Sequence, residues 1–173
     1  MSRLNRILNG VFILTAAAWF GGIVALVMIL PALFGSTEIT RTQAALLAGN
    51  ILLRFDRVAL GLLPVLCVAG LATRVAARAS GKAAAATLLF LLVVSASKLS
   101  GVFVLRPAMD TLQAAIPSFE RSAPSTPSRD RFNQLHHVAE ALMGVDLVAL
   151  GVLLVLPAGA ARRRDASAPG GNA

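Results

Sequence analysis

The chain alternates long apolar runs with short polar connections. The runs cover about residues 7–34, 58–73, 83–105 and 135–156. An α-helix of ~20 apolar residues spans the hydrocarbon core of a bilayer, and a shorter run can cross when flanking basic side chains reach the headgroups. Successive helices joined by short connections lie antiparallel. The pattern therefore predicts an all-α integral membrane four-helix bundle with up-down topology.

Two segments outside the runs have patterns of their own. Residues 38–55 alternate apolar side chains with Arg, Gln and Asn at helical spacing, as an amphipathic helix does. We predict a helical extension that lies at or projects from the membrane surface and continues into the second span. Residues 162–173 start with three arginines and end in Gly, Asn and Ala. They are expected to form a basic, disordered tail after a single membrane domain of residues 1–161.

Composition agrees with a membrane protein. Hydrophobic residues make up 57% of the chain and charged residues 14%, against about 25% charged residues in soluble domains. The net charge of +8 comes from basic residues near the ends of the runs. These are expected to contact anionic lipid headgroups at the termini and the central loop, rather than nucleic acid. The sequence does not decide whether the chain forms a homo-oligomer or a hetero-oligomer.

Two charged residues lie well inside the apolar runs. Lys98 is in the third run and Asp146 is in the fourth. If these spans are antiparallel neighbours, the two residues lie at one depth. A lone charge at the bilayer centre costs about 2.5–3.5 kcal/mol on insertion scales, and pairing removes most of that cost. We therefore predict a buried Lys98–Asp146 ion pair.

The same register predicts a second polar cluster, at the outer interface. It places Arg106 opposite Glu140 and Asp110 opposite His136. From the inner pair to the outer pair, however, one helix turns by about 80° and the other by about 240°. The two pairings therefore cannot both lie along one straight contact between the two helices. Either a third helix takes part or one pairing is wrong.

The first run contains small residues at a regular spacing. Ala17, Gly21 and Ala25 recur every four positions, and such spacing lets another helix approach closely in a membrane. The alternative is a chance pattern in an alanine-rich chain. Trp19 lies in the middle of the run, away from both interfaces. We expect it to pack against another helix.

Motifs for enzymatic chemistry are absent from the sequence. It has no P-loop, GxGxxG, HExxH or Ser–His–Asp pattern, so we expect no enzyme activity and predict no cofactor. His136 and Glu140, four positions apart, could supply two ligands to a metal ion. His137 points about 100° away from His136 on a helix, so the two histidines cannot hold one ion from one face. Haem with two histidine ligands would need a histidine from another helix or another subunit.

Several short segments resemble a known family. They are Trp19–Gly22, Pro31–Phe34, Ala48–Gly49 and Leu53–Asp56. They are similar to the first half of bacterial membrane proteins of the domain-of-unknown-function 4149 family, which is related to the eukaryotic transmembrane protein 205. The resemblance implies four spans, the last beginning with a bulky residue and a histidine, here Phe132 and His136. Members typically carry a serine and an asparagine where this chain has Ala139 and Met143.

The resemblance implies no established activity. The eukaryotic member is associated with resistance to platinum drugs, which implies export or trafficking without a mechanism. We expect a multi-pass protein of the bacterial inner membrane with both termini in the cytoplasm. Our first hypothesis is that it handles a small solute, an ion or protons through a polar cluster between spans three and four. The alternatives are a structural or assembly module whose buried charges set helix packing and, more weakly, metal or haem binding at His136.

Overall fold

Helices make up nearly all of the described chain. The computed structural model describes residues 3–76, 81–120 and 124–166. Its elements are α1 (Arg3–Gly35), α2 (Arg41–Ala76), α3 (Lys82–Ser100), the π-helical turn η1 (Gly101–Leu105), α4 (Arg106–Ala114) and α5 (Pro127–Ala166). α3, η1 and α4 follow one another without a break, and four helices are long and apolar enough to cross a membrane. The predicted all-α bundle with four spans is confirmed.

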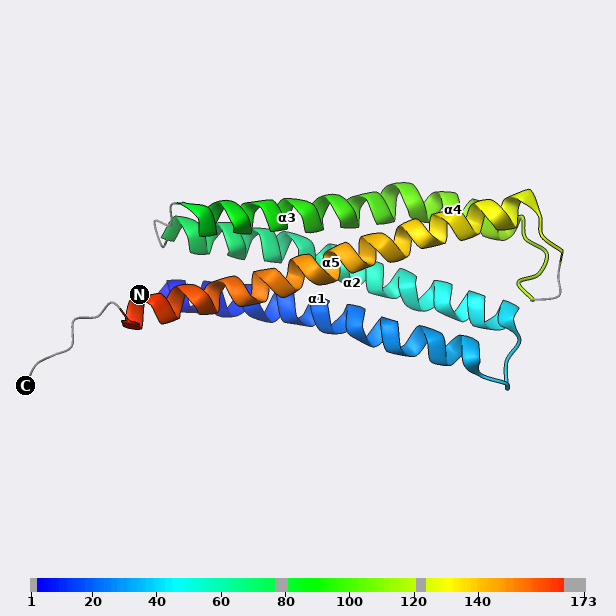
Figure 1. Cartoon of the computed structure of the whole chain (residues 1–173), viewed down its shortest axis with the longest axis horizontal. Coiled ribbons are helices and arrows are strands. Elements are labelled where there is room, and N and C mark those ends of the chain that lie inside the picture. The colour runs from blue at the N-terminus through cyan, green and yellow to red at the C-terminus, as the bar shows by residue number, and fades with distance from the viewer. Residues whose placement is uncertain (1–2, 77–80, 121–123, 167–173) are drawn as a thin grey trace, which may run out of the picture.

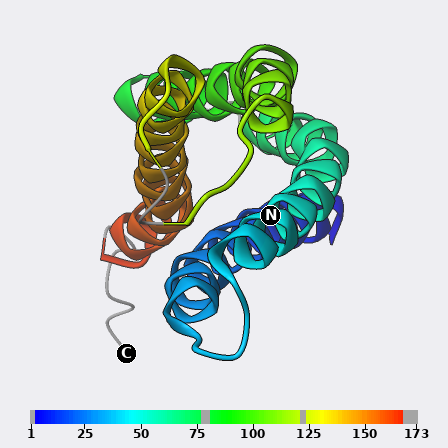
Figure 2. The ribbon, with the colours of Figure 1, turned by 90° about the vertical axis from the view of Figure 1, so that its right-hand side faces the viewer.

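The four spans are antiparallel neighbours around a ring. α1 packs against α2, α2 against α3, α3 and α4 against α5, and α5 against α1, as the view along the bundle shows (Figure 2). One end of the bundle holds the start of α1, the α2–α3 connection and the end of α5 (Figure 1). We call it the basic end, after Arg3, Arg6, Arg74 and Lys82. The opposite end, with the α1–α2 and α4–α5 connections, is the distal end.

The amphipathic segment continues into the second span as one helix, as predicted, but the membrane-spanning part was placed too late. The sequence placed its start at residue 58, but α2 is one helix from Arg41 to Ala76 and passes through Pro64. The amphipathic extension and the second span are therefore the same helix. Asp56, which the prediction left outside the membrane, is 15 positions into α2, about 22 Å along its axis.

The third span also continues beyond its predicted end at Arg106 and Pro107. A proline in a helix cannot donate a backbone hydrogen bond, and its ring crowds the carbonyl of the preceding turn. Here the chain widens into the π turn η1 immediately before Arg106, whose N–H bonds to the Gly101 carbonyl five residues back. The wider turn accommodates Pro107, and the helix continues to Ala114.

The fourth span is longer than predicted at both ends. α5 begins at Pro127 and continues through Pro157, where the sequence predicted its end. The first part of the predicted disordered tail, residues 162–166, is helical. The rest, residues 167–173, lies outside the described residues.

The core is apolar and contains side chains from all four spans. Trp19 is 1% exposed and packs with the buried residues Phe12, Ile23, Leu63, Leu66, Leu91, Val94, Leu150 and Leu153. The expected packing of Trp19 is therefore confirmed.

The predicted stripe of small residues on α1 does not pack inside the bundle. Ala17, Gly21 and Ala25 are exposed, because the buried face of α1 is the one that carries Trp19 and Ile23. The close helix approach is made by Gly22 instead. A Cβ atom there would lie 2.6 Å from Cε2 of Phe55 on α2, whereas a Cβ at Gly21 would meet nothing within 4 Å.

These neighbouring glycines give a matched test of the α1–α2 contact. We expect Gly22→Val to lower the free energy of unfolding by about 1–3 kcal/mol, because the added methyl groups overpack against Phe55. Gly21→Val makes the same chemical change on the open face and should be close to wild type. Thermal unfolding of both variants in detergent measures the difference. Equal loss in the two would show that the contact is not made.

Candidate functional site

The four spans carry polar groups at one depth. Helix positions measured from the basic end give this depth: Trp19 is 16 positions from Arg3, Asp56 is 18 from Arg74, Lys98 is 16 from Lys82, and Asp146 is 16 from Arg162. At ~1.5 Å per residue, all four lie about 24–27 Å from that end. We call Trp19, Asp56, Lys98 and Asp146 the polar layer.

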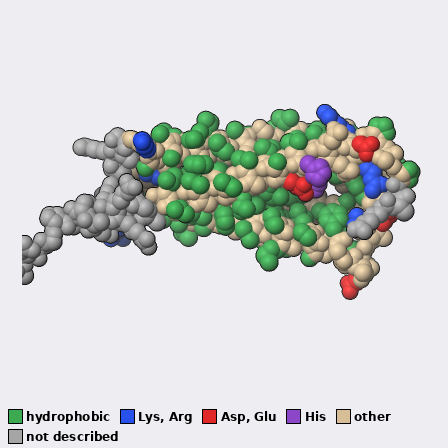
Figure 3. All heavy atoms as spheres, in the orientation of Figure 1, with side chains coloured by type: hydrophobic (Ala, Val, Ile, Leu, Met, Phe, Trp, Pro, Cys, Tyr) green, Lys and Arg blue, Asp and Glu red, His purple; other side chains and the backbone are tan. Residues whose placement is uncertain are grey.

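The polar layer lies close to the distal membrane interface. With the basic end at one face of a hydrocarbon core ~30 Å thick, a depth of about 24–27 Å is just below the other face. Arg54 and Arg57 of α2 support this placement: both are exposed on the outside of the bundle, where an arginine needs headgroups or water within reach. Hydrophobic side chains cover the middle of the bundle, and basic side chains lie at both ends (Figure 3).

Lys98 forms its ion pair with Asp56 of α2. The Nζ atom of Lys98 bonds to Oδ1 of Asp56 and lies 5.1 Å from the ring centroid of Phe55, a distance suited to a cation–π contact. The sequence predicted Asp146 as the ion-pair partner of Lys98. That prediction was wrong, because the direct bond is to Asp56. The depth argument was sound, but it compared only spans three and four, and the short predicted span two had excluded Asp56.

Arg106 supports the same acid from the distal side. Its Nη1 lies 3.7 Å from Oδ2 of Asp56, its Nη2 donates to the Gly49 carbonyl at 2.8 Å, and its Nε is 3.2 Å from Oδ1 of Asp110. On a regular helix Arg106 would point about 80° away from Lys98. The π turn between them adds about one residue to a turn and removes about 100° of rotation. Both cations therefore face Asp56.

Asp146 lies in the same layer without an ion-pair bond of its own to Lys98. Its side chain is 6% exposed, and Oδ1 finds no hydrogen-bond partner among the described residues. The carboxyl group interacts with Ser97 and, electrostatically, with Lys98. Ser97 also donates to the Leu142 carbonyl at 3.3 Å, which holds α3 against α5 one turn from Asp146.

A second buried polar atom in this layer lacks a partner. The Nε1–H of Trp19 has no acceptor within the described ranges. A buried donor or acceptor without a partner costs about 1–3 kcal/mol. Trp19 and Asp146 thus bring a donor and an acceptor without partners among the described residues to one depth.

The predicted outer cluster separates into two groups. Arg106 and Asp110 join the Asp56 site, whereas His136 and Glu140 form a surface group on α5. Nε2 of His136 is 3.3 Å from Oε1 of Glu140, and Nδ1 of His137 is 3.0 Å from Oε2. In the part of the chain that the structure describes, no group of three or more His, Cys, Asp or Glu side chains is placed to hold a metal ion.

Sequence reasoning missed Asp56 as a site residue, although one signal pointed to it. Asp56 ends the short segment Leu53–Asp56, which contributed to the family resemblance. It also follows Phe55, whose ring contacts both Gly22 and Lys98. The segment therefore supplies both the acid and the aromatic ring around Lys98.

Comparisons with known proteins give one match. The family model described as "Domain of unknown function (DUF4149)" matches residues 14–118. This range includes Trp19, Asp56, Lys98 and Arg106, while Asp146 lies after it. Neither the curated proteins nor the solved structures contain a significant match.

A double-mutant cycle tests the partner of Lys98. We expect Asp56→Asn to lower the free energy of unfolding by about 3 kcal/mol, because it leaves a buried ammonium without its counter-charge. Combined with Lys98→Gln, it should show a coupling energy of about 1–3 kcal/mol. Denaturant titrations in mixed micelles measure both.

The matched control cycle pairs Asp146→Asn with the same Lys98→Gln change. Its coupling should be smaller, because Asp146 interacts with Lys98 only through space. A larger coupling at Asp146 than at Asp56 would contradict the assignment and restore the pairing predicted from sequence.

Proposed function

The chain belongs to the DUF4149 family, and we propose that it moves protons, alone or together with a small solute, across the membrane through the polar layer. The observation that carries this proposal is Asp146, a buried acid with an unpartnered oxygen beside a lysine that is already paired. An ionisable side chain inside a span marks an ion or proton path by default.

Asp146 can exist in two protonation states in this place. As a neutral acid it is compatible with the apolar side chains around it, and its proton can be donated in a hydrogen bond. As a carboxylate it is stabilised by the nearby ammonium of Lys98. Because each protonation state has a stabilising interaction here, the residue is suited to take up and release a proton.

Lys98 provides a way to couple that proton to movement. Its flexible stem lets the ammonium reach acids on two sides, Asp56 on α2 and Asp146 on α5. When Asp146 loses its proton, Lys98 can shift toward it. Asp56 then keeps a counter-charge, because Arg106 lies 3.7 Å from its second oxygen. This movement of Lys98 changes which helices are joined by ion pairs, and each carboxylate keeps a positive charge nearby.

A line of polar side chains connects the layer to the distal end. The exposed fraction falls from 58% for Asp110 to 20% for Arg106 and Asp56 and 9% for Lys98. On the basic side of the layer the bundle is filled by buried apolar residues, including Leu66, Val94 and Leu153. The described conformation therefore favours access from the distal end, and transport requires the apolar core to open.

Orientation follows from the basic end. We propose that the protein lies in a bacterial inner membrane with both termini in the cytoplasm, since the segments before the first span and after the last carry Arg3, Arg6 and Arg162 to Arg164, and the flanks of the first span usually set the orientation. Anionic headgroups of the inner leaflet would contact these residues. The polar layer then faces the outside of the cell.

Proton flux into reconstituted vesicles tests the function. With a pH-sensitive dye inside and a potassium diffusion potential across the membrane, we expect the wild-type protein to acidify the lumen faster than protein-free vesicles do. Asp146→Asn should reduce this flux at least about tenfold, because an amide cannot take up and release a proton at neutral pH. Asp146→Glu should retain part of it.

Glu38→Gln is the control for this experiment, because it removes an exposed acid outside the spans and should leave the flux unchanged. Equal fluxes for wild type and Asp146→Asn would contradict the role of Asp146.

A structural role is the second candidate, and the Lys98–Asp56–Arg106 group favours it, since these residues join α2 to α3 and η1–α4. A protein without flux but with strong Lys98–Asp56 coupling would support this alternative.

A further inference from the structure

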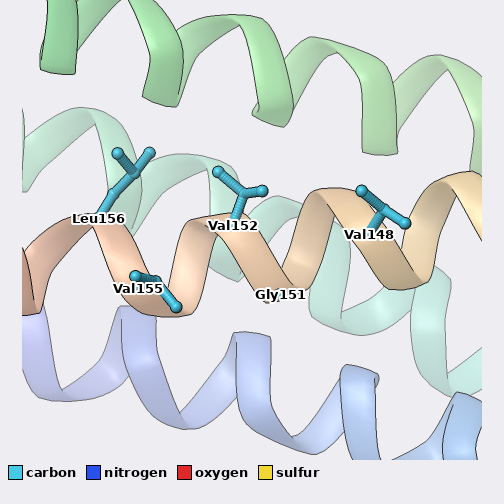
Figure 4. A pocket seen from close by; sticks show the side chains of 5 residues that line it. All are labelled: Val148, Gly151, Val152, Val155 and Leu156. Carbon is cyan, nitrogen blue, oxygen red and sulfur yellow. The ribbon is translucent and has the colours of Figure 1, made fainter.

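Two hollows lie along one face of α5 and are lined by residues other than those of the polar layer. The first has a volume of about 310 Å³ and lies between α1 and α5, where Ile23 and Pro31 face Glu140, Met143 and Gly144. The second, of about 350 Å³, continues along α5 between Val148 and Leu156 (Figure 4). Both are lined almost entirely by apolar side chains.

Residues that line the two hollows follow one face of α5, which we call the track. Glu140, Gly144, Val148, Gly151 and Val155 recur every three or four positions and therefore lie on one face of the helix. Gly144 lines the first hollow, one turn before Val148 of the second, and a Cβ atom at Gly144 would meet nothing within 4 Å. From Glu140 to Val155 the track is about 22 Å long, comparable with an extended acyl chain.

Depth places the charged end of this track among lipid headgroups. Glu140 is six positions from Asp146 toward the distal end, about 9 Å farther out. It is therefore about 33–36 Å from the basic end, beyond a hydrocarbon core ~30 Å thick and within the headgroup region. The glycines and valines of the track extend from there into the hydrocarbon.

The group at this end has both acidic and imidazole functions. Glu140 is half-exposed, with His136 and His137 within 3.3 Å and 3.0 Å of its two oxygens. The His136 ring stacks on Phe132, which fixes its orientation. Histidine and acidic side chains lie together on the surface, beside the hydrophobic face (Figure 3). A carboxylate accepts hydrogen bonds from an ammonium group, and imidazole N–H groups donate to phosphate oxygens.

We propose that this face binds a phospholipid of the distal leaflet whose headgroup carries a primary ammonium and a phosphate. The lipid ammonium replaces the histidine N–H groups at Glu140. The released N–H groups of His136 and His137 then donate to the phosphate, and one acyl chain lies along the track past Gly144. The headgroup charges decide the occupant: phosphoglycerol lacks the cation, and a quaternary phosphocholine has no N–H to donate to Glu140.

Native mass spectrometry of the full chain with added lipid tests this binding. We expect phosphatidylethanolamine to remain bound in preference to phosphatidylglycerol and phosphatidylcholine of the same chain length. Glu140→Gln should weaken phosphatidylethanolamine binding about tenfold, as expected for the loss of one charge-assisted hydrogen bond, with little effect on the other two lipids.

Gly144→Leu should weaken binding of all three lipids, because its side chain fills the open part of the track. Gly61→Leu on α2 is the matched control, since Gly61 is also exposed with no atom within 4 Å of a Cβ, and it should bind like wild type. Circular dichroism melts show that each variant is folded.

Three results would overturn the proposal. They are equal affinity for the three lipids, no effect of Glu140→Gln, and a dimer that forms without lipid and is lost in Gly144→Leu. The last would show that a second copy of the chain covers this face.

Discussion

The bond between Lys98 and Asp56 is the constraint on which the rest of the bundle depends. An ammonium buried inside the bundle needs a paired charge, and its partner on α2 fixes how α2 and α3 lie along each other. The π turn η1 brings a second cation to the same acid. Without the π turn, Arg106 would point away from Asp56, and only Lys98 would reach the acid. Pro107, which makes a regular helix costly at this point, thus helps to assemble the site.

Hydropathy was sufficient to predict the four spans and their antiparallel order, because an apolar helix in a membrane has few alternatives. Their ends were harder to predict. Charged residues such as Asp56 and Arg106 normally mark the end of a span, but here they lie within continuous helices that project beyond the hydrocarbon core. Excluding Asp56 from the membrane led directly to the wrong partner for Lys98. The turn angle between Lys98 and Arg106 had indicated an inconsistency, and the π turn that resolves it has no simple sequence signature.

Small residues show the same limit of sequence reasoning. Spacing alone selected Ala17, Gly21 and Ala25, yet the bundle uses Gly22, one position away and on another face of α1. The choice between these faces depends on a large partner, Phe55 of α2, which a pattern within one helix cannot include. Likewise, the outer cluster was predicted from the depth of its residues in the membrane. Depth alone does not give the direction in which each side chain points from its helix. Arg106 faces α2, while Glu140 faces the groove beside α1.

Asp56 and Asp146 differ in what packing alone can explain. Asp56 has two cations and a place between helices, so its charge is compensated where it lies. Asp146 has one oxygen without a partner and an environment of buried apolar residues. A buried polar group that is not fully hydrogen-bonded lowers stability, and an apolar side chain of similar volume would serve packing better. Packing alone therefore does not account for the acid at position 146, which is why we propose a proton-exchanging role for it.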